Sequence, residues 1–170
     1  MGFKVPHVRT LVAMGAASIA LVFQIVGVVT ASWVTADNDV IGNSRSGLWE
    51  TCTDVFGCHS YGSDVPDWMN ACRAFGILGI LLLAGCCLMG VLSCFSDNDK
   101  LPLMAAVLSF AAGVCVIVEF TVYLCKVDIS GVLNFKYGYS FALTVAACIL
   151  AFPAGICSLL SRRRGYSALG

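Results

Sequence analysis

Four long apolar blocks alternate along the chain with polar connections of very unequal length. The blocks cover about 11–31, 73–94, 103–125 and 139–160. Blocks of about 20 residues, at 1.5 Å rise per residue, cross a hydrocarbon core of ~30 Å. The pattern predicts a single domain of four transmembrane helices. Its connections are at 32–72, 95–102 and 126–138, and its tail is at 161–170.

The first block has an alternative interpretation as a secretory signal peptide. Lys4 and Arg9 precede it, and small residues end it at 30–32. Signal peptides, however, have apolar regions of about 7–15 residues. This block is longer, so we expect it to stay in the protein as the first transmembrane helix.

Charge is scarce and is unevenly distributed. Only 12% of the residues are charged, against about a quarter in a soluble domain. The chain ends carry Lys4, Arg9 and the triplet 162–164 of arginines, whereas six of the ten acids lie in the long connection. Because positive charge favours the cytosolic side, we expect a plasma-membrane protein with both termini in the cytosol. No basic stripe indicates nucleic acid; the expected partners are membrane lipids and other membrane proteins.

The connection 32–72 is the only long polar segment, and it contains Cys52 and Cys58. It faces the outside in the predicted orientation, where disulfides persist. Five residues separate the two cysteines, and Leu48, Trp49 and Phe56 around them favour strands. The segment therefore predicts a small β-sheet with a hairpin closed by a disulfide. Two free thiols are the alternative.

The same segment carries a family resemblance. Trp33, the triplet Gly47, Leu48 and Trp49, and the two cysteines resemble the W…GLW…C…C signature of the claudin superfamily. That group includes claudins, the peripheral myelin and epithelial membrane proteins, the lens fibre membrane intrinsic protein and calcium-channel γ subunits. Arg73 resembles the arginine at the outer end of the family's second helix, and residues 137–141, YGYSF, resemble the start of its fourth helix in some branches.

The resemblance implies a membrane α+β fold. In it, a left-handed antiparallel four-helix bundle carries an extracellular antiparallel sheet of about five strands, mostly from the first loop. Trp33, Trp49 and the disulfide would anchor the sheet near the membrane, and Arg73 would brace it. The cysteine spacing and the short first loop are nearer the epithelial membrane and lens branch than typical claudins, and the tail lacks the Tyr-Val type ending of claudins. Taken alone, the tryptophans are typical of any membrane interface.

Glu119 is the only ionisable residue well inside an apolar block, roughly 9 Å from the outer end of its helix. Carboxylates inside a membrane are costly and are usually paired or functional. Arg73, at the outer end of the neighbouring helix, is the candidate partner in an intramembrane brace. The alternatives are a neutral Glu119 bonded to backbone or hydroxyl groups, and a contact with an ion or ligand.

Further candidate sites lie near the two membrane surfaces. Asp54, Asp64 and Asp67 fall in the region that lines paracellular pores in claudins, so the resemblance implies cation preference if pores form. The alternative is that they only keep the sheet soluble. The cysteines near the membrane boundaries form two pairs: Cys94 and Cys157, candidates for palmitoylation on the cytosolic side, and Cys72 and Cys125, candidates for a second disulfide on the outer side.

Catalytic motifs are absent from the sequence, so we expect no enzyme, cofactor or metal site. His7 and His59 fall on opposite sides of the membrane in the predicted topology and cannot share a metal. The leading functional hypothesis is a claudin-like protein of cell–cell contacts, acting through its outer sheet and lateral assembly. The second is an auxiliary subunit of an ion channel or receptor, and the third is a paracellular cation-selective pore.

Overall fold

The computed structural model describes most of the 170-residue chain. The described residues are 8–38, 42–62, 65–96, 98, 100–127 and 135–166, without the side chains of 38, 135 and 162–166. They form four long helices and five short strands. In chain order these are α1 (Val8–Val29), β1 (Val34–Asn38), β2 (Gly42–Ser46), β3 (Glu50–Thr53), β4 (Gly57–Ser60), α2 (Asp67–Ser93), α3 (Lys100–Lys126), β5 (Phe135–Tyr137) and α4 (Tyr139–Tyr166).

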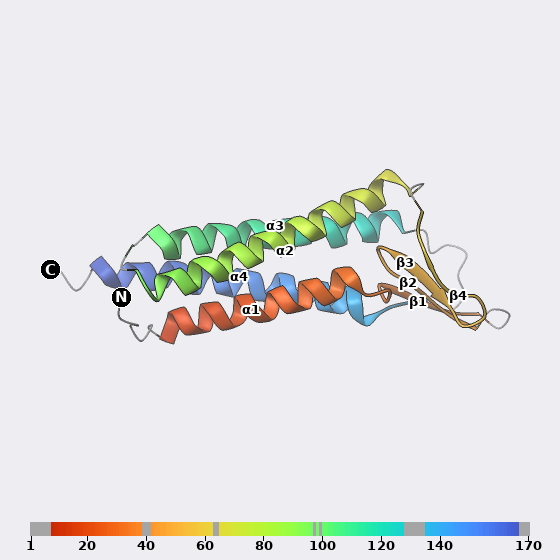
Figure 1. Ribbon diagram of the computed structural model, residues 1–170, viewed down its shortest axis with the longest axis horizontal. Coiled ribbons are helices and arrows are strands. Elements are labelled where there is room, and N and C mark those ends of the chain that lie inside the picture. Colours follow the sequence, from red (N-terminus) through yellow and green to blue (C-terminus); the bar gives the residue numbers. More distant parts are fainter. Residues whose placement is uncertain are drawn as a thin grey trace.

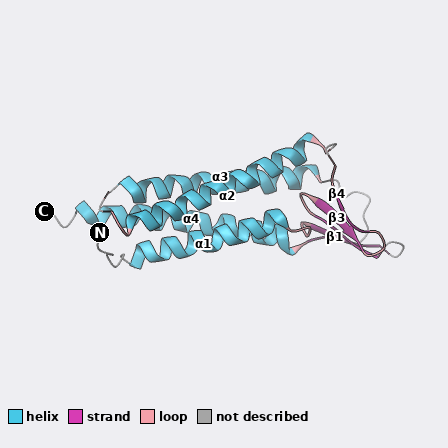
Figure 2. Ribbon diagram, in the orientation of Figure 1, coloured by secondary structure: helices cyan, strands magenta, loops and turns pink. Residues whose placement is uncertain are grey.

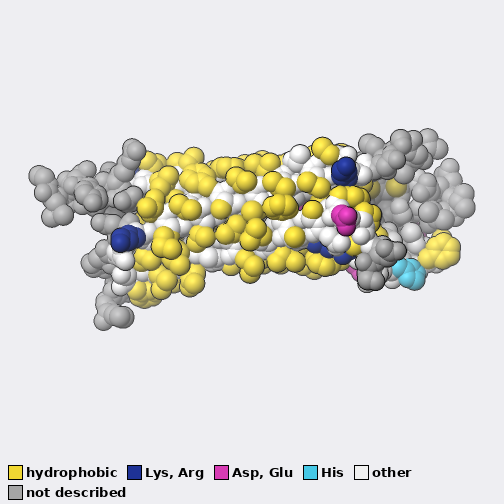
Figure 3. Space-filling model, turned by 90° about the horizontal axis from the view of Figure 1, so that it is seen from above, with side chains coloured by type: hydrophobic (Ala, Val, Ile, Leu, Met, Phe, Trp, Pro, Cys, Tyr) yellow, Lys and Arg dark blue, Asp and Glu magenta, His cyan; other side chains and the backbone are white. Residues whose placement is uncertain are grey.

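The helices lie side by side as an elongated bundle, and the strands form a sheet at one end of it (Figures 1 and 2). We call this the sheet end; the opposite end, where α1 begins and α4 finishes, is the terminal end. All four helices are long and apolar enough to cross a membrane. In Figure 3 hydrophobic side chains cover the length of the bundle, and charged side chains gather near its two ends. The predicted membrane α+β fold is confirmed.

The helices extend beyond the apolar blocks of the sequence. α2 begins at Asp67, directly after Pro66, whereas its apolar block begins near residue 73. The carboxylate of Asp67 in this first turn interacts favourably with the helix dipole. Met69, two residues later, packs in the core beneath the sheet. The first turns of α2 therefore project from the apolar band and contact the sheet.

Small residues dominate the buried positions along most of the bundle, as the sequence suggests. Their side chains let helix backbones approach closely, which is how helices associate in lipid. Two phenylalanines, one on α3 and one on α4, each pack against a glycine of the other helix. Phe110 of α3 lies over Gly155 of α4, and Phe152 of α4 lies over Gly113 of α3, with the two rings 6.1 Å apart.

The sheet is antiparallel, with strand order β4-β3-β2-β1-β5. Four strands come from the connection 32–72. The fifth, β5, comes from the second connection and pairs with β1, with Val34 opposite Tyr137. The five-strand expectation is thus confirmed. Side chains alternate across a sheet, so Val34 joins the core while Thr35 and its cross-strand neighbour Arg45 share the opposite face.

Candidate functional site

Trp33 holds the sheet to the bundle. Its side chain is fully buried, and its Nε1–H donates a 2.7 Å hydrogen bond to the carbonyl of Gly27, in the last turns of α1. The ring packs 4.7 Å from Tyr123 of α3 and 5.9 Å from Phe141 of α4, measured between centroids. Its backbone N–H donates to Ser46 of β2. One residue therefore connects three helices and the sheet.

The Gly47-Leu48-Trp49 turn is the second anchor. A Cβ on Gly47 would lie 2.6 Å from the Cα of Ala31, so only glycine lets the turn approach the end of α1. Leu48 is fully buried in the same core as Trp33. Arg73 of α2 donates from Nε to the carbonyl of Leu48 at 2.8 Å. Its guanidinium lies 4.7 Å from the ring centroid of Trp49, a cation–π contact.

The β3–β4 hairpin is closed by the Cys52–Cys58 disulfide, as predicted. The two cysteines are direct cross-strand partners, so the bond holds the register of the hairpin. β3 starts next to the Gly47 turn, at the bundle, and runs away from it. The turn 54–56 therefore lies at the far edge of the sheet, and its end is formed by Gly57 with φ of +72°.

Glu119 lies fully buried between the helices near the sheet end. Its Oε2 accepts a 2.6 Å hydrogen bond from Nε2 of Gln24, which is equally buried on α1. Because Arg73 turns toward the sheet and bonds Leu48, the predicted ion pair between Glu119 and Arg73 is wrong. The remaining Oε1 atoms of Glu119 and Gln24 have no hydrogen-bond partner among the described residues.

Two glycines of α2 make room for this buried polar pair. A Cβ on Gly76 would lie 2.5 Å from Oε1 of Glu119, and one on Gly79 would lie 3.8 Å from Nε2 of Gln24. The Cys72 thiol donates to the backbone carbonyl of Glu119 at 3.5 Å. The pair thus links α1 and α3 across a glycine surface of α2. Gln24 was the missed partner; a polar side chain in an otherwise apolar block was the available signal.

The acids predicted to face an ion or partner have different surroundings. Asp54 lies at the hairpin turn, and its Oδ2 accepts a 3.0 Å hydrogen bond from the backbone N–H of Asn43. This bond ties β2 to the hairpin. Asp67 lies in the first turn of α2, and Asp64 lies outside the described residues. The structure therefore gives Asp54 and Asp67 local structural roles, and the expectation of a cation path stays a prediction.

The boundary cysteines are free thiols. Cys94 is buried, and its Sγ lies 3.5 Å from the carbonyl of Gly90 and 4.0 Å from Sδ of Met14. Cys157 is partly exposed, so it is the more accessible of the two candidate palmitoylation sites. Cys72 is buried and Cys125 exposed, and no disulfide joins them. Within the described residues no three His, Cys, Asp or Glu side chains gather in a metal-binding group.

A groove of about 600 Å³ lies between the sheet and the outer ends of α1 and α4. Thr30, Ala31 and Tyr139 line it from the bundle, and Arg45 and Glu50 line it from the sheet. The sequence did not indicate it, because Arg45 and Glu50 are brought to one face only by the pairing of β2 with β3.

Comparisons with known proteins agree with this architecture. The model of the PMP-22/EMP/MP20/Claudin family matches residues 8–158. Human epithelial membrane protein 1 is 22% identical over 164 residues, covering 96% of each chain. The rabbit (Oryctolagus cuniculus) protein of that name is 26% identical over 166 residues, covering 94% of each chain. Mouse (Mus musculus) protein NKG7 is 27% identical over 168 residues, covering 92% of this chain and 96% of its own.

Proposed function

The chain belongs to the PMP-22/EMP/MP20/Claudin family, and from that premise we propose that it organises cell–cell contacts. In this proposal it is a non-enzymatic, multi-pass protein of the plasma membrane. Its sheet recognises a partner on the neighbouring cell, and its helices assemble laterally with other membrane proteins.

Two features support placing the sheet end outside the cell. The Cys52–Cys58 disulfide needs an oxidising compartment to persist. Five positive residues, Lys4, Arg9 and the arginines at 162–164, belong to the segments at the terminal end, as expected for the cytosolic side. The sheet then projects into the space between cells.

The exposed tip of the β3–β4 hairpin is the observation that carries the proposal. Val55 and Phe56 occupy the turn, and their side chains are 62% and 68% exposed. They lie at the edge of the sheet away from the bundle, where water and not lipid surrounds them in the proposed orientation. These two adjacent apolar side chains could be covered by a partner, and aromatic side chains are enriched in protein interfaces.

The structure around the tip suits recognition. The disulfide and the Asp54 bond to Asn43 hold the turn, while Trp33 fixes the sheet on the helices. A contact element that is already ordered loses little conformational freedom on binding, so more of the contact energy appears as affinity.

A cell-mixing experiment tests this function. Cells that express the protein with a fluorescent label are mixed with cells that carry a second label, and enrichment at their contacts is measured. We expect enrichment where both cells express the protein, and its loss in the variant V55S/F56S. Because both side chains are exposed, the variant should still reach the surface.

The matched control is Ser60→Ala, in the exposed strand β4 of the same hairpin. We expect it to behave as wild type. Unchanged enrichment in V55S/F56S would contradict the proposed role of the tip. If a large channel copurified in stoichiometric amounts and the protein were not enriched at contacts, the auxiliary-subunit hypothesis would be favoured instead.

A further inference from the structure

We propose that the groove between the sheet and the outer ends of α1 and α4 holds the headgroup of a zwitterionic phospholipid, of the phosphatidylcholine type, from the adjoining membrane leaflet. This site is separate from the exposed hairpin tip, and it does not depend on the protein's action at cell contacts.

The end of the groove nearest the bundle lies at the depth of the lipid headgroups, while Asn43, Thr53 and Asp54 line its far end. The wall nearest the bundle is formed by Val29 and the residues that follow it at the end of α1, and by Tyr139 at the start of α4. Tyr139 is exposed, as aromatic side chains are at the boundary between hydrocarbon and water. Headgroup layers extend about 5–7 Å beyond the hydrocarbon on each side. A strand rises about 3.3 Å per residue, so the first residues of the sheet beyond the Gly47 turn fall in this layer.

The charges at this depth have opposite signs. Arg45 lies near the end of β2 that faces the bundle, and Glu50 lies at the corresponding start of β3. Arg45 pairs with Cys52, so Glu50, two residues before Cys52, is its diagonal neighbour on the same face. Such neighbours lie about 7–8 Å apart. Two long side chains of opposite charge that start this close together can reach the phosphate and the ammonium of one zwitterionic headgroup.

Both charges are free to bind a ligand. Neither the guanidinium of Arg45 nor the carboxylate of Glu50 has a hydrogen bond or ion pair with another residue in the described ranges, although both line the groove. Thr30 and Ser32 line the wall nearest the bundle, and Val29 borders it where the lipid chains would begin. A volume of about 600 Å³ is within the range of small-molecule sites.

Competing occupants fit less well. An anionic headgroup would satisfy Arg45 but would face Glu50 and also Asp54, farther along the groove. A free metal cation would meet the positive charge of Arg45 in the same space. A zwitterionic headgroup uses both signs of charge and brings no net negative charge near Glu50 and Asp54.

Native mass spectrometry of the full-length protein tests the site. The protein is purified in micelles with equal amounts of phosphatidylcholine and phosphatidylglycerol of identical chains, and the lipids retained are counted. We expect wild type to prefer phosphatidylcholine. The trimethylammonium of phosphatidylcholine has no N–H, so Glu50 would attract it by charge alone. Because an exposed ion pair contributes up to about 1 kcal/mol, which is about fivefold in affinity, Glu50→Gln should shift the preference toward phosphatidylglycerol by up to about that factor. Arg45→Gln should weaken retention of both lipids.

Lys126→Gln is the matched control, since it also removes one exposed charge at the sheet end but lies outside the groove. It should leave the lipid preference unchanged. Equal retention of both lipids by wild type, or the same shift in Lys126→Gln as in Glu50→Gln, would overturn the proposal. Loss of a dimer in Arg45→Gln, with lipid retention intact, would assign the groove to a second copy of the chain.

A second measurement covers the case in which a variant folds poorly. Wild-type protein is crosslinked to phosphatidylcholine that carries a photoreactive group on its headgroup, and the labelled peptides are mapped. We expect labelling at 29–32 and at 43–54, with competition from excess phosphatidylcholine. Labelling elsewhere only, or labelling that excess lipid does not reduce, would refute the site.

Discussion

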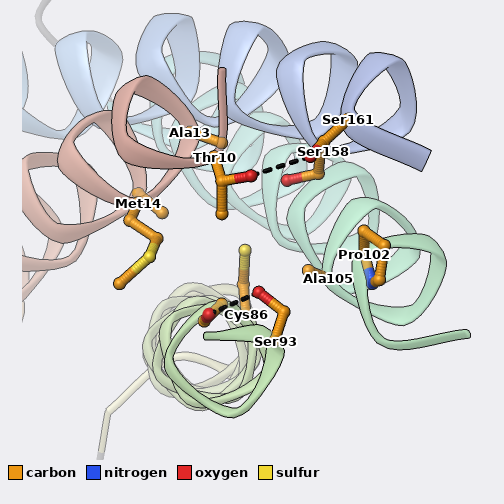
Figure 4. A pocket seen from close by; sticks show the side chains of 11 residues that line it. Thr10, Ala13, Met14, Cys86, Ser93, Pro102, Ala105, Ser158 and Ser161 are labelled. Atoms are coloured by element: carbon orange, nitrogen blue, oxygen red, sulfur yellow. Dashed lines mark hydrogen bonds between the residues drawn. The ribbon is translucent and has the colours of Figure 1, made fainter. Parts of the chain in front are cut away.

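At the sheet end of the bundle the helices meet through large side chains with defined partners, whereas at the terminal end they meet through small ones. At the sheet end the helices are connected by Trp33, Tyr123 and the Gln24–Glu119 pair. At the terminal end, Thr10 of α1 and Ser161 of α4 share a 2.7 Å hydrogen bond. Beside them lies a cavity of about 20 Å³, shown in Figure 4, with room for about one water molecule.

The difference follows from what each end supports. A five-stranded sheet with strands of three to five residues has little core of its own, so its position depends on the residues that join it to the helices. Within the described residues, no sheet is attached at the terminal end, and close packing of small side chains is sufficient there. We therefore expect substitutions at the sheet end to cost more than comparable substitutions at the terminal end.

Trp33→Ala should have the largest effect. It removes a fully buried aromatic side chain from the junction of three helices and leaves the Gly27 carbonyl without its donor. Buried Trp→Ala changes cost about 3–5 kcal/mol, which is a large fraction of the stability of a domain this size. We expect little protein at the cell surface and a clearly lower midpoint of thermal unfolding in mild detergent.

Met14→Ala is the corresponding change at the terminal end. Met14 borders the small cavity and is only partly buried, so its truncation removes fewer contacts. We expect a loss below about 2 kcal/mol and near-normal surface expression. Equal losses in the two variants would mean that both ends depend on large side chains, which would contradict the comparison.

The sequence was sufficient to predict the helices and the disulfide, and the family resemblance implied the anchoring residues. Each of these depends on a local pattern: apolar length for the helices, short cysteine spacing for Cys52 and Cys58, and the Gly47-Leu48-Trp49 triplet for the turn. Hydropathy did not locate the start of α2, because it detects the lipid-facing part of a helix. The turns from Asp67 project beyond that part and pack under the sheet.

The partner of Glu119 could not be predicted in the same way. Gln24 and Arg73 lie at similar distances from the sheet ends of their helices, α1 and α2, so the rotation of each helix in the bundle decides which one faces Glu119. Arg73 instead has a nearby acceptor at Leu48 and a ring at Trp49. The groove charges Arg45 and Glu50 were missed for a related reason, since strand register and not spacing places them together.

A double-mutant cycle on Gln24 and Glu119 should give the second largest effect. Gln24→Leu leaves the buried Glu119 carboxyl without its donor, and a buried polar group left unpaired costs about 1–3 kcal/mol. The double variant Gln24→Leu with Glu119→Leu removes both polar groups and should recover most of that loss. Unfolding by denaturing detergent, followed by helical circular dichroism, measures the stabilities of wild type, Gln24→Leu, Glu119→Leu and the double variant.

Glu119→Gln is the control for this cycle, because it keeps the size of the side chain and an oxygen that can accept from Gln24. We expect it to cost less than either single leucine variant. If the double variant is no more stable than the single ones, the two side chains do not act as a pair. The sheet end would then depend on its aromatic core alone.

The smallest effects, and the most closely matched, should come from the two hydroxyl pairs that join α1 to α4. Thr10 bonds Ser161 at the terminal end, and Thr30 bonds Ser140 at the sheet end, at 2.7 and 2.6 Å. Hydrogen bonds between membrane helices contribute about 0.6 kcal/mol on average, so Thr10→Ala should cost no more than this. Thr30→Ala should cost about 1 kcal/mol, because Thr30 also bonds the Val26 carbonyl and lies against the Gly47 turn. The same denaturing-detergent titration compares them. A greater loss in Thr10→Ala than in Thr30→Ala would show that position along the bundle does not determine the cost, since substitution and helix pair are otherwise the same.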